Sequence, residues 1–117
     1  MLKFVVVLYK RSDFGDSQFN EFLRTVHGPL ALRLPGLRKY VQNYPVADAR
    51  RPPPRWSAIV ELYWDDREAM EAAWASPQGQ LATADLAAFA DLSHTSWSTV
   101  EEVLPAIRSS AESRRLG

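Results

Sequence analysis

The side chain best suited to chemistry is His27, which is followed directly by Gly28-Pro29. His27 lies four residues after Leu23, a spacing that places two side chains on one face of a helix. The ordinary pKa of an imidazole is ~6.5, so it can gain or lose a proton near neutrality. The motif predicts an acid–base group at a helix end beside an apolar wall. For an isolated histidine, a core-edge side chain paired with backbone is the commoner interpretation.

A second candidate is Tyr40, in a predicted strand where alternation places Tyr40, Gln42 and Tyr44 on one face. A tyrosine combines an apolar ring with a hydroxyl that needs a partner when buried, which suits a pocket wall as well as a strand edge. Tyr40 could donate a hydrogen bond to a carbonyl or enolate oxygen. Flat rings suit a planar ligand, although for any single ring an ordinary core role is commoner. The predicted pocket walls are Tyr9, Tyr44, Trp64, Trp74, Phe89 and Trp97.

Composition excludes several classes of protein. The 117 residues carry 14 basic and 14 acidic side chains, a balance that disfavours a general binder of nucleic acid or of anionic membranes. The chain has no cysteine and two histidines, His27 and His94, so it cannot form a thiolate site or a three-histidine metal site. No dinucleotide fingerprint or P-loop occurs, so we expect no metal and no cofactor. With no export signal and no run of about 20 apolar residues, we expect a soluble, cytoplasmic protein that binds no membrane.

The elements that position His27 come early in the chain. The apolar run 4–9 predicts a strand that is buried on both faces. A helix should follow from about residue 16 and end at Gly28 in the left-handed conformation, because Pro29 cannot continue the hydrogen-bond ladder. The spacing assigns four residues to the core face of this helix: Phe19, Phe22, Leu23 and Val26.

Two more helices are predicted in the second half of the chain. The first begins at Asp65 or Asp66, and the second begins at Pro77 with Ser76 as its cap. Asp85 falls close to the apolar stripe of the second helix. Because a buried acid is costly unless it is paired, we expect Asp85 to lean outward. The stripe itself is predicted to comprise Leu81, Ala84, Ala88, Phe89 and Leu92.

Further strands are predicted at 37–44, 57–64 and 95–103, which gives the order β-α-β-β-α-β with the second helical segment broken in two. This is an α+β, ferredoxin-like pattern, with a four-stranded antiparallel sheet that carries its helices on one face. Burying one large apolar side chain is worth ~1.5–3 kcal/mol, so the bare and apolar opposite face should not stay in water. We therefore expect a homodimer through the open sheet face, a domain at 1–104, and a tail or short helix at 105–117.

Four stretches carry a family resemblance: 2–9, Val26-His27-Gly28-Pro29-Leu30, 34–40 and 73–80. In this order and at these spacings the chain resembles the EthD family, named for the degradation of ethyl tert-butyl ether. The resemblance covers about residues 2–104. It implies a dimeric α+β barrel, and such proteins often carry the label of reductase or oxidoreductase.

Methylmuconolactone methylisomerase, a related barrel enzyme, is similar at His27 and at Pro35-Gly36-Leu37 followed by Tyr40. The resemblance implies catalytic roles for His27 and Tyr40. The chain departs from that enzyme in the loop before the third strand, where a further pocket histidine is replaced by arginines: Arg50, Arg51 and Arg55.

The predicted function is acid–base chemistry by His27 and Tyr40 on a cyclic or aromatic carbonyl compound, without a cofactor, in an apolar pocket. Isomerisation, cyclisation and dehydration fit such a site better than hydride transfer. Two alternatives stay open. One is an accessory protein or ligand carrier for an oxygenase system. The other is a haem-binding barrel with His27 or His94 as the axial ligand.

Overall fold

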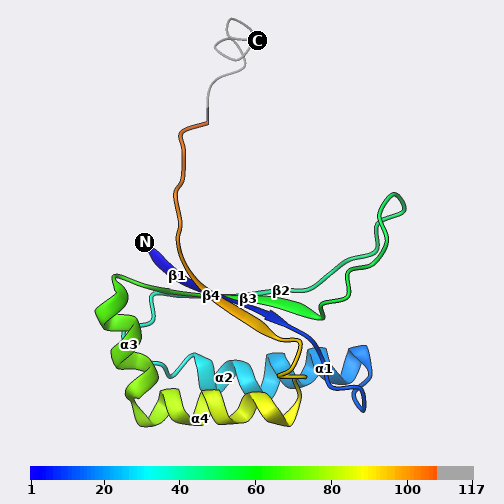
Figure 1. The fold of residues 1–117 in the computed structure, drawn as a ribbon, viewed down its shortest axis with the longest axis horizontal. Coiled ribbons are helices and arrows are strands. Elements are labelled where there is room, and N and C mark those ends of the chain that lie inside the picture. Colours follow the sequence, from blue (N-terminus) through cyan, green and yellow to red (C-terminus); the bar gives the residue numbers. More distant parts are fainter. Residues whose placement is uncertain (108–117) are drawn as a thin grey trace, which may run out of the picture.

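A computed structural model describes residues 1–107 as two layers, a four-stranded antiparallel sheet with every helix on one of its faces (Figure 1). The sheet order is β2-β3-β1-β4, which confirms the predicted ferredoxin-like α+β fold. Residues 108–117 of the predicted tail lie outside the described part. The elements are β1 (Leu2–Leu8), α1 (Asp16–Phe22), η1 (Leu23–His27), α2 (Gly28–Ala31), β2 (Lys39–Asn43), β3 (Ala58–Trp64), α3 (Arg67–Ala75), α4 (Pro77–Asp85), η2 (Leu86–Ala88) and β4 (Ser96–Glu101).

The core lies between the sheet and the helices. In β1 the side chains of Phe4, Val6 and Leu8 point toward the helices, and their partners on β3 are Leu62, Val60 and Ala58. Alternation gives each strand one helix-facing row and one row on the open face. The most deeply buried large side chains are Trp64, Phe19, Phe89, Leu8, Leu23 and Met70.

The first helical segment does not end at Gly28. Gly28 has φ −55°, in the ordinary right-handed region, and the chain continues from η1 into α2. The N–H of Gly28 donates to the carbonyl of Leu23, five residues back, so η1 is a π-helical turn that is wider than an α-helical one. A wide turn relieves the clash that the ring of Pro29 would make in a regular α-helix. The predicted left-handed stop was wrong.

The wide turn also changes which side chain faces the core. Phe19 and Leu23 are fully buried as predicted, but Val26 is 43% exposed whereas His27 is 8% exposed. In a regular α-helix both positions would border the core face. The prediction of Val26 as a core residue was therefore wrong, because the turn favours His27 as the inward side chain.

The caps of the second half follow the sequence. Asp66 accepts a hydrogen bond from the N–H of Ala69 at the start of α3, and the Ser76 hydroxyl accepts one from the N–H of Gly79 at the start of α4. These side chains satisfy the free amides of a first helical turn, so the local sequence determines where α3 and α4 begin.

The predicted apolar stripe of α4 was wrong in phase. Leu81 and Leu92 are 60% and 45% exposed, and the buried members of α4 are Gly79 and Ala82. A Cβ at residue 79 would overlap the carbonyl of Ala73, so Gly79 packs closely against the end of α3. Among the predicted members, Ala84 and Ala88 are also exposed, and Phe89 is the one that is buried.

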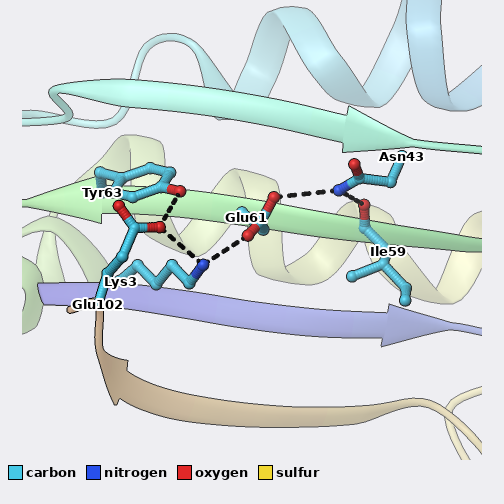
Figure 2. Close-up of polar contacts among 6 residues, drawn as sticks. All are labelled: Lys3, Asn43, Ile59, Glu61, Tyr63 and Glu102. Atoms are coloured by element: carbon cyan, nitrogen blue, oxygen red, sulfur yellow. Dashed lines mark hydrogen bonds and ion pairs between the residues drawn. The ribbon is translucent and has the colours of Figure 1, made fainter. Parts of the chain in front are cut away.

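The sheet face opposite the helices carries a polar network (Figure 2). The ammonium of Lys3 lies 2.6 Å from Glu61 and 2.9 Å from Glu102, and the hydroxyl of Tyr63 donates to Glu102. Asn43 donates to Glu61 and to the carbonyl of Ile59. We call this set the Lys3 network; it lies beside half-buried apolar side chains such as Val5, Val7 and Val41.

Two segments extend away from the two layers (Figure 1). One joins β2 to β3 and contains the stretch 50–55. The other is 102–107, beyond β4, where Val103, Leu104 and Ile107 are largely exposed. Within the described residues, none of the helices has the length and hydropathy that a membrane span requires.

Candidate active site

His27 lies at the end of the π-helical turn and points into the space between the helices and the sheet. Its ring packs against the ring of Phe89, with 5.0 Å between the two centroids. Phe89 in turn stacks on Phe22, at 4.9 Å, so the imidazole has an aromatic wall behind it. This burial confirms that position 27 faces the interior.

The partner of His27 is Asp85, the last residue of α4. The Nδ1 atom of His27 lies 2.9 Å from Oδ2 of Asp85, and the two side chains are 10% and 19% exposed. The prediction that Asp85 leans outward was wrong. The imidazole N–H gives the half-buried carboxylate a hydrogen-bond partner, which offsets the cost of removing it from water. The carboxylate accepts from Nδ1–H, which leaves Nε2 as the nitrogen with a free lone pair.

Two opposing effects set the protonation of His27. Burial lowers the pKa of the imidazole below its ordinary value, since a charged ring is poorly solvated there, and the hydrogen bond and charge of Asp85 raise it. Burial is the larger effect, so the net pKa is lowered. Near neutral pH the ring is therefore a neutral base that is oriented by a carboxylate.

His27 lines a small cavity between the sheet and the helices. The cavity has a volume of about 140 Å³, and its walls come from β1, β3, β4, η1, α2, α3, α4 and η2. Apart from His27 and Thr83 the walls are apolar, with Phe4, Leu62 and Trp74 among them. A dry apolar cavity of about 150 Å³ can bind benzene, so this one accommodates about one ring. The four-ring macrocycle of haem does not fit it.

The predicted aromatic residues divide between the cavity and the core. Trp74 and Trp97 line the cavity beside His27. Trp64 is fully buried, donates from Nε1 to the carbonyl of Pro35, and packs edge-to-face on Trp74 at 5.1 Å. Trp64 and Phe89 therefore support the residues of the wall without forming its surface.

Tyr40 on β2 and Tyr44, which directly follows that strand, belong to one hydrogen-bonded row. The hydroxyl of Tyr44 donates to Oε1 of Gln42 at 2.7 Å, and Nε2 of Gln42 donates to the hydroxyl of Tyr40 at 2.9 Å. The same Nε2 donates to the carbonyl of Leu23 at 3.1 Å. Burial raises the pKa of the Tyr40 phenol above its ordinary value. Neither tyrosine is among the residues that line the His27 cavity.

Tyr9 lies in a different place, at the end of β1. It lines an open cleft of about 730 Å³ beneath the loop that joins β2 to β3, together with His94. The ring of His94 packs near that of Tyr9 at 5.9 Å, and its Nδ1 pairs with Asp91 at 2.8 Å. Of the predicted site residues, the structure thus brings His27, Trp74 and Trp97 to one cavity and leaves Tyr9, Tyr40 and Tyr44 outside it.

Two polar members of the cavity region, Asp85 and Thr83, were not predicted from the sequence. The signal for Asp85 was its awkward position beside an apolar stripe, which was taken as a reason to turn it outward. Within residues 1–107, no group of three or more His, Asp or Glu side chains is placed to hold a metal ion.

The chain is similar in sequence to proteins of one family. The model of the EthD domain matches residues 11–93. An uncharacterized 11.0 kDa protein of Rhodococcus erythropolis, from the thcB–thcC intergenic region, is 34% identical over 88 residues, which are 74% of this chain and 84% of that protein.

Solved structures share the fold. An EthD family protein of Bacillus halodurans superposes with a TM-score of 0.75 at 24% identity, covering 88% of this chain and all of that one. A dimeric ferredoxin-like protein of Thermobifida fusca gives 0.65 at 14% identity, over 85% and 88% of the two chains. SnoaB of Streptomyces nogalater, described as a cofactor-independent oxygenase, gives 0.60 at 17% identity, over 90% and 97%.

Proposed function

Because this chain belongs to the EthD family, we propose that it is a cofactor-independent enzyme whose His27 moves a proton on a small cyclic or aromatic carbonyl compound. The observation that carries the proposal is the 2.9 Å contact between His27 and Asp85 at the wall of an apolar cavity. A carboxylate that holds one imidazole nitrogen and leaves the other free is an arrangement suited to general acid–base catalysis.

The proton transfer is assigned to Nε2 of His27. As a neutral base, Nε2 takes a proton from the carbon next to the substrate carbonyl, and the electron pair of that C–H bond passes into an enolate. The imidazolium that results is stabilised by the carboxylate of Asp85. The same proton can return to a different carbon, which isomerises the substrate, or assist the departure of a hydroxyl, which dehydrates it.

The cavity limits the substrate. Its volume of about 140 Å³ suits a single ring, and its apolar walls favour a neutral compound with few polar atoms. Thr83 offers one further hydroxyl at the wall. SnoaB, which shares the fold, is described as acting without a cofactor, so chemistry of this kind is compatible with the scaffold.

Tyr40 stays a proposed catalytic residue, as the sequence suggested. Its position relative to the cavity differs from that of His27. Its hydroxyl is tied to Gln42 and lies outside the residues that line the cavity. A hydrogen bond from Tyr40 to a substrate oxygen would require a larger space than this cavity provides. We therefore assign the proton transfer to His27, with Asp85 as the group that orients its ring.

We further propose that two chains pair through the open sheet face. Half-buried apolar side chains such as Val5, Val7 and Ile59 lie there, and the Lys3 network satisfies its charges within one chain. Both carboxylates of the network therefore stay ion-paired when that face is covered. The Thermobifida fusca protein of the same fold is described as dimeric.

The test follows solvent deuterium into single-ring ketones, enones and lactones by NMR, after a thermal-shift screen has identified those that bind. Wild type should exchange the hydrogens next to the carbonyl, and His27→Ala should lose that exchange by about 100-fold or more, the usual range for a lost acid–base group. His94→Ala is the matched control, since it removes an exposed histidine, and it should behave as wild type.

Two results would count against this assignment. Exchange that is unchanged in His27→Ala would remove the catalytic role of the imidazole. Ligands that bind equally to wild type and His27→Ala, with no exchange by either protein, would favour the carrier function instead.

A further inference from the structure

The amide of Gln42 is fixed by three hydrogen bonds. Its Oε1 accepts from the hydroxyl of Tyr44, and its Nε2 donates to the hydroxyl of Tyr40 and to the carbonyl of Leu23. Because a backbone carbonyl can only accept, the amide must turn its NH₂ group toward Leu23. The orientation of Gln42 is therefore determined by its partners.

The carbonyl of Leu23 is also the acceptor of the π-helical turn. It takes the N–H of Gly28, five residues ahead, and it takes Nε2 of Gln42 at 3.1 Å. A carbonyl oxygen has two lone pairs, so these two donors satisfy it completely. In a regular α-helix the same oxygen would instead face the N–H of His27, four residues ahead.

Gly28 makes this arrangement possible. A Cβ at residue 28 would lie 2.9 Å from Nε2 of Gln42 and 3.0 Å from the carbonyl oxygen of Leu23. Both distances are too short for a carbon in ordinary packing. The absence of a side chain at this position lets the β2 amide approach the turn and reach its carbonyl.

The width of the turn decides where His27 points. The turn directs His27 inward to Asp85 and leaves Val26 at the surface. Returning residues 23–27 to a regular α-helix would rotate the imidazole about the helix axis and away from that contact. Gln42 stands on the strand that faces the turn, and it reaches the acceptor on which the wide turn depends.

We propose that Gln42 is a positioning residue that holds the π-helical turn of η1 and so fixes the contact between His27 and Asp85. It acts through the carbonyl of Leu23 and is not one of the residues that line the cavity. This role rests on the proposed function only in so far as His27 is the proton-transferring group. Its structural part can be tested without substrate.

The test is ¹⁵N NMR of the His27 ring in Gln42→Leu, which removes the amide, and in Gln42→Glu, which keeps an acceptor for Tyr44 but cannot donate to Leu23. Wild type should show the Nδ1–H tautomer. In both variants the ring should lose that preference, and its titration midpoint should move away from the wild-type value, because the contact with Asp85 that raises the pKa is disturbed. The Gly28 amide should exchange with solvent about 2- to 10-fold faster, the range expected for one lost hydrogen bond.

Asn43→Ala is the matched control, because it removes an amide from the neighbouring residue of β2 on the other face of the sheet. It should leave the His27 tautomer and midpoint unchanged. An unaltered His27 spectrum in a folded Gln42→Leu or Gln42→Glu protein would overturn the proposal. So would failure of both to fold while Asn43→Ala folds, because Gln42 would then support the fold as a whole.

The two proposals fail separately. If the Gln42 variants change the His27 spectrum, but His27→Ala retains full deuterium exchange on substrate, the positioning role stands and the catalytic role falls. If His27→Ala abolishes exchange and the Gln42 variants leave the spectrum unchanged, the catalytic role of His27 stands and the positioning role of Gln42 falls.

Discussion

At the scale of residues, the site depends on how a buried imidazole and a half-buried carboxylate balance each other. Burial favours the neutral form of the imidazole. The 2.9 Å contact lets Asp85 keep a partner, while the lowered pKa of His27 keeps the ring neutral near pH 7. A base held in this state can accept a proton without first losing one.

The lowered pKa of His27 predicts how stability depends on pH. Between the folded and the unfolded pKa, the unfolded chain binds more protons than the folded one, so stability rises with pH. The contribution of His27 is fully present above the unfolded value of ~6.5 and is lost as the pH falls toward the folded value. Replacing His27 with Gln should therefore flatten the dependence below pH ~6.5.

Urea unfolding at a fixed protein concentration, from about pH 5 to pH 8, measures this dependence. His94→Gln controls for the loss of a histidine that is exposed. The interpretation is contradicted if His27→Gln and wild type lose stability in parallel as the pH falls.

At the scale of elements, the helices show which features are fixed locally. The capping side chains Asp66 and Ser76 and the proline at residue 77 could be predicted, because each acts on amides within its own first turn. The alternation on β2 was also predictable from period two. These signals need no information from distant parts of the chain.

The phase of the helical faces could not be predicted in the same way. The π-helical turn depends on an amide 19 residues away, and the inward position of Asp85 depends on a histidine 58 residues away. Spacing rules assume a regular helix, so they placed Val26 inside. They put Asp85 close to the apolar stripe, and the cost of burying an unpaired acid was the reason to turn it outward. In α4 they also favoured Leu81, whereas the close approach of the Ala73 carbonyl leaves no room for a side chain at Gly79.

The exposure of Leu81 on α4 can be tested against the buried Leu23 of η1 with a matched pair of substitutions. Leu81→Ala removes a side chain that is 60% exposed and should change the free energy of unfolding by about 0.5 kcal/mol or less. Leu23→Ala removes the same atoms from a fully buried position and should cost about 2–5 kcal/mol. Denaturant unfolding of both variants provides the comparison, and equal losses would restore the predicted stripe.

At the scale of the whole molecule, the sheet has one face covered by helices and one that is open (Figure 1). The apolar rows of that open face are half-buried in the single chain, and pairing two copies would remove them from water. The Lys3 network supplies polar groups that are already paired. This combination favours association of like faces around a two-fold axis.

The proposed dimer predicts different effects for two apolar-to-acid changes. Val7→Glu puts a charge on the open face opposite Ile59, and it should weaken association by roughly 100-fold or more, since an unpaired buried charge costs several kcal/mol. Leu32→Glu puts the same charge on the helical side, where the leucine is 63% exposed, and it should leave the mass unchanged. Light scattering over a range of concentrations distinguishes them. A wild-type mass of one chain, or dissociation by Leu32→Glu alone, would exclude this interface.

The charges around Lys3 have a consequence for how two such faces meet. Lys3 and Lys39 balance Glu61 and Glu102, so these four groups present a patch with no net charge to an incoming copy, and added salt should have little influence on its rate of encounter. Lys3 holds the pKa of both glutamates below the ordinary range, which preserves this neutrality in mild acid. In stronger acid the glutamates take up protons, so each of these patches gains net positive charge and two such surfaces repel each other.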